Sequence, residues 1–227
     1  DYFSGEDLPA CTGALVQIDD GDSTVVLLES EFQPGVYETP ANFHGIPGKI
    51  YSLSVQNVDI DDDGILDTVH ASSFLPQVPI PDSIKVVQNK QFDGWDIKFY
   101  AWEPSATRDY YMFRAYINGK LVTDTITELS IQDDLLINGN YTFGIPVYFL
   151  NSKKNDEILH HGDTVTLELA SITQEYFDFL VEVQTVDFGS NPLFSGPPAN
   201  ISSNISGDSF GFFTAYSVVK CNTIFLP

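Results

Sequence analysis

Sulfur and positive charge are both scarce in this chain of 227 residues. It contains two cysteines and one methionine, and 10 Lys and Arg residues stand against 32 Asp and Glu residues, for a formal net charge of −22. A chain this negative repels phosphate groups, so we expect neither nucleic acid nor an anionic membrane surface as a partner. The charge suits cations, basic partners or solubility. The hydrophobic fraction of 43% is sufficient for a folded core and argues against general disorder.

The scarcity of cysteine leaves little room for disulfide or zinc chemistry. Cys11 and Cys221 have no neighbouring cysteine or histidine at zinc spacing. We expect two separate buried thiols, and a disulfide that ties the start of the chain to its end is the alternative. His160 and His161 precede a strand and point to opposite faces, which favours a polar turn over a metal site.

Several familiar sequence features are also missing. No uninterrupted apolar run approaches the roughly 20 residues that span a bilayer. No signal peptide precedes Asp1, so we expect a mature or trimmed chain. The G-x-S-x-G, H-E-x-x-H, P-loop and Rossmann motifs do not occur, and no pair of acids stands out as the pair of a glycoside hydrolase. The sequence therefore indicates no particular reaction.

Short alternating segments bounded by turn residues dominate what is present. The acidic run 19–22 and the pair Asn118-Gly119 are strong hairpin signals, and 95–102 alternates apolar and polar residues as a half-buried strand does. Strands are expected at 14–18, 24–28, 36–39, 49–58, 68–74, 95–102, 110–117, 120–123, 163–170, 212–219 and 223–226. The protein is therefore expected to be mainly β.

One segment has the spacing of a helix. Residues 171–174 match a capping box, and apolar side chains follow at intervals of three and four residues up to Val181. Glu175 lies in the first turn, where the helix dipole favours negative charge. We expect one helix of about three turns over 174–185.

Three prolines, Pro76, Pro79 and Pro81, indicate a boundary, because they cannot lie inside a sheet and favour a stiff extended linker. They predict an N-terminal domain of residues 1–78 and a C-terminal domain of residues 79–227. Strands of this kind pack as small antiparallel sandwiches. We therefore expect two β-sandwich units, with one short helix in the C-terminal unit.

The sharpest chemical signal is an aspartate window at residues 59–67, which matches D-x-D-x-D-G-x-x-D. Calcium takes six to eight oxygen ligands, and alternate aspartates in a tight loop can aim their carboxylates at one point. The predicted ligands are Asp59, Asp61, Asp63, the backbone carbonyl of Ile65, and Asp67. Ile65 and Leu66 should then turn their side chains toward the protein.

The context of this window is a hairpin between two strands. An EF-hand would need a bidentate Glu at position twelve, where His70 stands, so the loop is not an EF-hand. The window resembles the calcium loops of integrin-like propeller blades over these nine residues only. A solvated acidic turn that discourages edge pairing is the alternative. We expect a structural calcium ion, because five aspartates repel one another without a cation.

Aromatic residues are numerous and admit two interpretations. Exposed rings would stack on sugars or on a peptide partner. Buried rings would instead fill the core of a sandwich whose chain has a single methionine. The second interpretation is the commoner one in proteins. The residues concerned include Tyr2, Phe3, Tyr110, Tyr111, Phe113, Tyr141, Phe143, Tyr148 and Phe149.

A family resemblance emerges from motifs spread along the chain. They are PGVY (34–37), GIPGKIY (45–51), YMFRAYINGK (111–120), GDTV (162–165), EYFDFL (175–180), NPLF (191–194), PPANI (197–201) and GFFTAYSV (211–218). In this order they resemble the Bacteroidetes lipoproteins classed as a domain of unknown function, the four-two-four-nine family. The resemblance spans nearly the whole chain.

The resemblance implies an exported outer-membrane lipoprotein of the cell envelope, often encoded beside TonB-dependent receptors, with an immunoglobulin-like N-terminal part. It supplies no catalytic residues. The chain departs from the family pattern because the lipid-bearing cysteine and the first strand that normally precede Asp1 are missing. Its cysteines are not family residues, and the aspartate window replaces an ordinary turn. The only membrane contact expected is through such a lipid anchor.

Together these observations favour a non-enzymatic binding module accessory to a TonB-dependent outer-membrane transporter. The expected partners are a TonB-dependent receptor and a glycan or peptide ligand. Two alternatives remain open, a secreted hydrolase acting on glycan or peptide and a structural adhesin or assembly subunit. Convergent acids in a cleft would favour the hydrolase, an exposed aromatic strip would favour binding, and a bare sheet edge would favour assembly.

Overall fold

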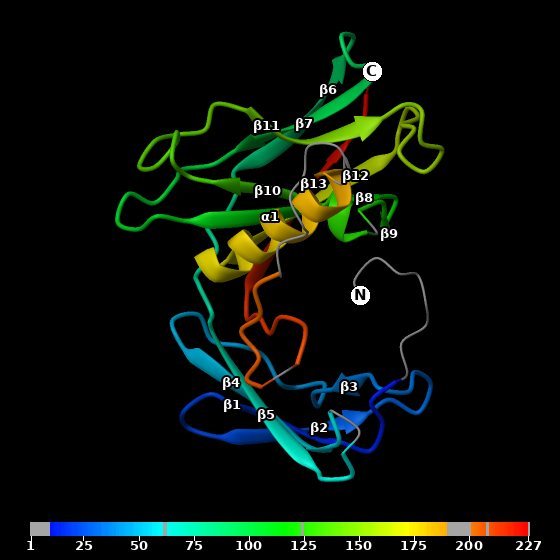
Figure 1. Ribbon diagram of the computed structural model, residues 1–227. Helices are drawn as coiled ribbons and strands as arrows, with labels where there is room; N and C mark the ends of the chain where they lie inside the picture. Colours follow the sequence, from blue (N-terminus) through cyan, green and yellow to red (C-terminus); the bar gives the residue numbers. More distant parts are fainter. Residues whose placement is uncertain (1–9, 61–62, 124, 190–200, 208, 227) are drawn as a thin grey trace. The chain divides into compact units, whose positions relative to one another are not determined.

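The computed structural model describes residues 10–60, 63–123, 125–189, 201–207 and 209–226 (Figure 1). These residues form antiparallel sheets and one α-helix. The prediction of a mainly β fold with one short helix is therefore confirmed. None of the helices in the described part is long and apolar enough to cross a membrane.

The chain divides into two compact units. The first comprises Asp1–Pro76 together with Thr185–Ala215, and the second comprises Gln77–Gln184 together with Tyr216–Pro227. The division after Pro76 falls at the proline-rich segment. The segment Thr185–Ala215, which the predicted boundaries place in the C-terminal domain, groups instead with the first unit.

The described residues of the first unit form one five-stranded antiparallel sheet in the order β3-β2-β1-β4-β5. Its strands are β1 (Leu15–Asp19), β2 (Thr24–Glu29), β3 (Tyr37–Glu38), β4 (Ile50–Val58) and β5 (Asp67–Phe74). Alternation along the strands buries Val16, Tyr51, Val69 and Ala71 on one face. The acidic turn between β1 and β2 is confirmed, and the Lys49 ammonium lies 2.9 Å from Asp20 and 2.7 Å from Asp22.

Hydrogen bonds explain why part of the late segment belongs to this unit. The His70 backbone N–H donates to the Ser206 hydroxyl over 2.8 Å, and the Ser206 N–H donates to the His70 carbonyl over 2.8 Å. The Asn204 amide donates to the Ser72 carbonyl over 3.1 Å. Residues 204–206 thus satisfy the outer edge of β5, a pairing that no local sequence pattern announces.

The second unit contains two sheets that share one core. Strands β10-β8-β12-β13 form the larger sheet, with β9 also paired to β8, and β11-β7-β6 form the smaller one. The bounds are β6 (Ser83–Asn89), β7 (Gly94–Tyr100), β8 (Tyr110–Ile117), β9 (Lys120–Leu121), β10 (Ser130–Asp133), β11 (Ile145–Asn151), β12 (Thr164–Ile172) and β13 (Ser217–Ile224). Ile97 and Phe99 from β7 join Phe113, Leu167 and Leu169 from the larger sheet in one buried cluster.

Three strands of this unit, β6, β10 and β11, were not expected from the sequence. β10 has only four residues, and β11 contains Pro146, where its pairing with β7 shifts register. The strands expected at 212–219 and 223–226 are one strand, β13, which pairs with β12 along its whole length. The Asn118-Gly119 turn is confirmed, with φ angles of 50° and 81°.

The helix α1 (Gln174–Gly189) begins where predicted and ends later. Thr173 provides the cap, since its hydroxyl accepts a hydrogen bond from the Tyr176 N–H over 3.3 Å. Ser171, the predicted cap, is instead a buried residue of β12. The helix buries Leu180 and Val183 completely, a consequence of its apolar spacing.

The two cysteines are free in the structure. Cys11 is exposed in the first unit, and Cys221 is half-buried on β13. The expectation that both thiols are buried is therefore wrong for Cys11. It lies before the first strand, where no sheet covers it.

Candidate functional site

The aspartate window forms the loop between β4 and β5, as expected. Val58 pairs with Asp67, and a register shift between Gln56 and Val58 sets the loop off from the ladder, with Asn57 in the left-handed region at φ 64°. Gly64 also has a positive φ, 84°, which only glycine adopts without cost. The loop thus starts and ends at adjacent positions of one hairpin.

Carboxylates hold this loop closed. The Asp59 side chain accepts hydrogen bonds from the N–H groups of Asp63 at 3.1 Å and Gly64 at 2.9 Å. The Asp67 carboxylate accepts from the Ile60 N–H at 3.1 Å, and Asp63 accepts from the Ile65 N–H at 2.7 Å. The structure therefore brings three of the predicted ligands into one loop.

Asp61 and the side chains of Ile65 and Leu66 complete the predicted calcium loop. Asp61, the remaining predicted carboxylate ligand, lies outside the described residues. The expectation that Ile65 and Leu66 turn their side chains toward the protein is wrong, because these side chains are 66% and 64% exposed. The loop conformation rests on Asx-type hydrogen bonds instead of apolar anchoring.

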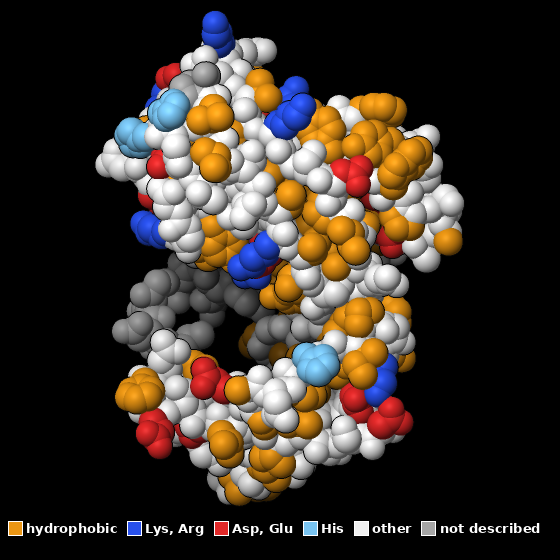
Figure 2. Space-filling model, turned by 180° about the vertical axis from the view of Figure 1, so that it is seen from behind, with side chains coloured by type: hydrophobic (Ala, Val, Ile, Leu, Met, Phe, Trp, Pro, Cys, Tyr) orange, Lys and Arg blue, Asp and Glu red, His pale blue; other side chains and the backbone are white. Residues whose placement is uncertain are grey.

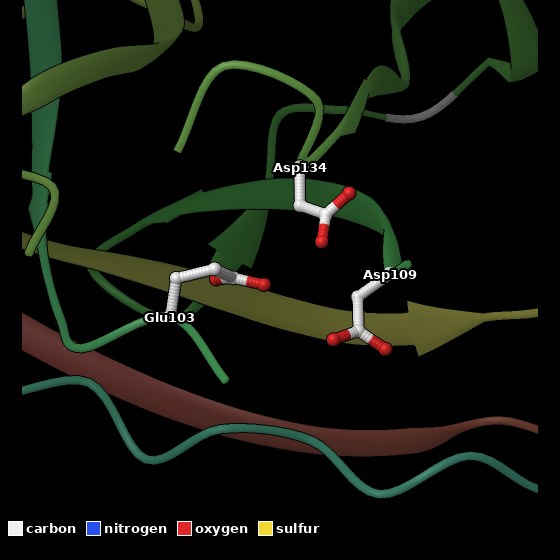
Figure 3. Close-up of side chains that lie close together, drawn as sticks. All are labelled: Glu103, Asp109 and Asp134. Atoms are coloured by element: carbon white, nitrogen blue, oxygen red, sulfur yellow. The ribbon is translucent and has the colours of Figure 1, made fainter. Parts of the chain in front are cut away.

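A second acidic group lies in the second unit. The side chains of Glu103, Asp109 and Asp134 each offer a carboxylate oxygen, and these oxygens lie within 4.8 Å of one another. Figure 3 shows that the three side chains come from separate segments of the chain and lie close together, with the Glu103 and Asp134 carboxylates turned into the space between them. We call this group the acidic cluster.

Strand pairing brings the cluster together. Asp109 directly precedes β8 and Asp134 directly follows β10, and these strands are antiparallel, with Asp133 opposite Tyr110. The two acids therefore flank the last pair of the ladder, and the Asp134 N–H donates to the Asp109 carbonyl over 3.1 Å. Glu103 follows β7, and its N–H donates to the Asn140 carbonyl over 3.0 Å.

The three carboxylates differ in burial and in partners. Glu103 is 5% exposed and accepts a hydrogen bond of 2.5 Å from the Tyr111 hydroxyl. Asp109 is half-buried and accepts from the Thr107 hydroxyl at 2.9 Å and 3.0 Å. Asp134 is 0% exposed, and neither of its carboxylate oxygens has a hydrogen-bond partner among the described residues.

Burial and mutual repulsion make it costly for the cluster to be fully ionised. Burial, with smaller contributions from the charges of Asp109 and Asp134, raises the pKa of Glu103 to about 7 although the Tyr111 hydroxyl opposes the shift. Burial and Asp134 also raise the pKa of Asp109. The Arg108 guanidinium pairs mainly with Asp133, 2.9 Å away, and its attraction to Asp134 is weaker. No described Lys or Arg forms an ion pair with the three cluster acids.

Sequence reasoning missed this cluster because its members lie in three separate segments. The pairing of β8 with β10 is what places Asp134 beside Asp109, and β10 is too short to be recognised as a strand from its sequence. The only usable signal is that Asp109 and Asp134 adjoin strand ends and that Glu103 lies three residues after one.

A strip of aromatic rings lies next to the cluster along the chain. The Trp102 and Tyr141 rings are 5.3 Å apart between centroids, and those of Tyr141 and Phe143 are 5.0 Å apart. Trp102 is 67% exposed and Phe143 is 81% exposed. Hydrophobic side chains gather on the surface of the second unit in the upper half of Figure 2. We call Trp102, Tyr141 and Phe143 the aromatic strip.

Most of the other aromatic residues in question do fill the core, as the commoner interpretation predicts. Tyr110, Tyr111, Phe113 and Tyr148 are all buried. Phe143 is the clear exception, and Tyr2 and Phe3 lie outside the described residues. The strip is therefore a departure from the way this chain uses its aromatic rings.

Two comparisons with known proteins bear on identity. The comparison with curated proteins gave no match. The family model described as Domain of unknown function (DUF4249) matches residues 2–221. Because this match covers almost all of the 227 residues, the chain belongs to that family.

Proposed function

We propose that this chain is a non-enzymatic binding module of the cell envelope that uses its aromatic strip to engage a TonB-dependent receptor, as the exported lipoprotein accessory of an outer-membrane transporter. The observation that carries the proposal is the strip itself. Aromatic rings are enriched in the energetically dominant centres of protein interfaces, because they bury a large area at little cost in side-chain entropy. The choice of partner rests on the resemblance to lipoproteins encoded beside such receptors.

The backbone beneath the strip is firmly held. Thr142 is buried between Tyr141 and Phe143, and its hydroxyl donates to the Phe99 carbonyl over 2.8 Å and accepts from the Ala101 N–H over 3.0 Å. Its own N–H donates to the Ala101 carbonyl over 3.0 Å. These three hydrogen bonds, which we call the Thr142 clamp, fix the backbone that carries Tyr141 and Phe143, of which Tyr141 is half-buried and Phe143 is exposed.

Further contacts fix individual rings. The Tyr141 hydroxyl hydrogen-bonds to Asp82, which raises the Tyr141 pKa. Phe143 has a φ of 51°, a conformation that costs a non-glycine residue on the order of 1 kcal/mol and so persists only where the surroundings enforce it. A rigid, pre-oriented strip loses little conformational entropy on binding, which favours recognition of a partner.

Burial argues against hydrolysis at the acidic cluster. A carboxyl group that acts as general acid or base must lie within hydrogen-bonding reach of the substrate. Glu103 and Asp134 are 5% and 0% exposed. Neither carboxyl group is therefore accessible to a glycan or peptide substrate.

Site-specific photocrosslinking tests the proposal. A photoreactive phenylalanine analogue at position 143 of the complete protein, expressed in its own cells, is expected to crosslink to a TonB-dependent receptor. Phe32, 91% exposed on the first unit, is the matched control position and should give no such product. Crosslinks from position 143 to a glycan or peptide alone would favour the ligand alternative. Absence of any receptor product would contradict the proposal.

We also propose that the loop of residues 59–67 binds a structural calcium ion. Each carboxylate oxygen has two lone pairs, so Asp59, Asp63 and Asp67 keep acceptor capacity beyond their hydrogen bonds to the loop. Excess calcium is expected to raise the melting temperature of the wild type more than that of Asp63→Asn, which keeps an acceptor oxygen but loses a charge. An equal calcium response in the two proteins would contradict this assignment.

A further inference from the structure

We propose that Glu103, Asp109 and Asp134 form a second cation site, which binds one calcium ion inside the second unit. The site shares no residue with the loop of residues 59–67, which belongs to the first unit. It does not depend on the proposed partner of the aromatic strip.

The strongest observation is the state of Asp134. Its side chain is completely buried, and both of its oxygens lack a hydrogen-bond partner among the described residues. Buried carboxylates are normally paired, hydrogen-bonded or bound to metal, because leaving one ionised and unsatisfied is costly. Since Asp134 is directed at two further carboxylates, a cation between them is the group that would satisfy all three (Figure 3).

The charge balance leads to the same conclusion. Three carboxylates within 4.8 Å carry up to three negative charges, and the nearest arginine in sequence, Arg108, pairs with Asp133. A divalent cation would leave a net charge near −1 on the cluster. The hydrogen bonds that the Tyr111 hydroxyl donates to Glu103 and the Thr107 hydroxyl donates to Asp109 stabilise this remaining charge.

The donor atoms select the kind of cation. The three side chains supply oxygen only, which suits hard cations and disfavours zinc and copper, for which nitrogen and sulfur ligands are preferred. Magnesium keeps several water molecules in a strict octahedron, whereas calcium accepts mono- and bidentate carboxylates in irregular geometry. The burial of Glu103 and Asp134 leaves little room for retained water, so calcium fits better.

The backbone around the cluster is prepared to hold these positions without the cation. The Asp134 carbonyl accepts hydrogen bonds of 2.8 Å from the N–H groups of both Ile137 and Asn138. The Asn138 amide donates to the Thr107 carbonyl over 2.7 Å, which links this turn to the segment that carries Asp109. Such a preformed frame is what a metal site needs for affinity.

Calorimetric titration of the full chain with calcium, after removal of bound metal by chelator, tests the proposal. The probe is calcium chloride, and the proteins are wild type, Asp134→Asn, Glu103→Gln and Asp63→Asn. Glu103→Gln is included as a second variant of the site because its amide oxygen can still accept the hydrogen bond from Tyr111. Asp156→Asn, a change at an exposed acid of the same unit, is the matched control.

The expected result is one calcium-binding event that is lost in Asp134→Asn and Glu103→Gln but retained in Asp63→Asn and Asp156→Asn. Two other results would overturn the proposal. One is a wild type that binds no calcium or whose calcium binding is entirely lost in Asp63→Asn. The other is a Glu103→Gln protein, shown to be folded by circular dichroism, that binds as many calcium ions as the wild type with unchanged affinity.

Discussion

The substitution Asp134→Asn is expected to have opposite effects on stability with and without calcium. Asparagine has nearly the volume of aspartate but no charge, and its amide can donate to the carboxylate of Glu103 or Asp109 within the same cluster. In chelator the variant should therefore be more stable than the wild type. In excess calcium it should be the less stable of the two, because it lacks a ligand.

The magnitude in chelator follows from the distances. Two like charges 4.8 Å apart repel each other by about 3.5 kcal/mol at an effective dielectric constant of 20, and Asp134 belongs to two such pairs. Protonating Glu103, whose pKa is about 7, costs only about 1.4 kcal/mol at pH 8, and this limits the repulsion between Glu103 and Asp134 to that amount. The attraction between Arg108 and Asp134 offsets part of the repulsion that remains from Asp109. At pH 8 we expect a gain of about 3 kcal/mol, which raises the melting temperature by roughly 6–12 °C.

The effect of calcium is estimated from binding linkage. A ligand present at 1,000 times its dissociation constant stabilises the native state by about 4 kcal/mol. The wild type gains this at the acidic cluster and the variant does not, so the order of stability reverses. Calcium bound at residues 59–67 contributes equally to both proteins and cancels in the comparison.

Thermal melts at pH 8, followed by near-ultraviolet circular dichroism in chelator and in excess calcium, measure both effects. The control Asp156→Asn should change the melting temperature equally in the two buffers. The reasoning is refuted if Asp134→Asn does the same. A variant less stable than the wild type in chelator would show that the carboxylate has a favourable partner, contrary to the repulsion calculated above.

Three further predictions concern other parts of the molecule. Arg114→Met should destabilise the protein by about 3 kcal/mol in urea unfolding, because it removes a cationic partner from the buried Glu168. Lys220→Met removes the other cationic partner of Glu168, which is half-exposed, and should cost no more than about 1 kcal/mol. Thr142→Val should cost about 1–3 kcal/mol and weaken crosslinking from position 143, since it removes both hydrogen bonds of the Thr142 hydroxyl. Backbone N–H groups lower the pKa of Glu29. The wild type should therefore have a higher free energy of unfolding than Glu29→Gln above pH 4.5, and this difference should disappear as the pH falls through the lowered pKa. Urea unfolding between pH 6 and 3 would measure it.

Local signals in the sequence account for much of the fold. The Asn118-Gly119 turn requires positive φ at both residues, and the structure has both. The helix from Gln174 follows from apolar spacing that buries Leu180 and Val183. The window 59–67 forms a hairpin loop because glycine and Asx turns favour one. In each case the residues that decide the conformation are adjacent in the chain.

Features that depend on distant pairing could not be predicted in this way. Strand β11 contains Pro146, which argues against a strand, yet its pairing with β7 absorbs the proline at a register shift. Residues 204–206 satisfy the edge of β5 across more than 130 residues of sequence. The acidic cluster has the same origin, because no motif relates Glu103 to Asp134 until β8 and β10 are paired.

The acidic cluster and the aromatic strip share their backbone, and this connects the two proposed sites physically. Trp102 is exposed and the next residue, Glu103, is buried, so one extended segment sends a ring outward and a carboxylate inward. The opposite segment is tied to it by the bridge between Trp102 and Tyr141 and by the hydrogen bond from the Glu103 N–H to the Asn140 carbonyl. A cation that fixes Glu103 therefore also restrains the backbone on which two rings of the strip are mounted. Linkage gives the direction of this coupling. Ordering of Trp102 and Tyr141 by calcium lowers the entropy that a partner loses on binding, so calcium should increase the affinity of the strip for its partner. A bound partner should then increase the affinity of the acidic cluster for calcium by the same factor.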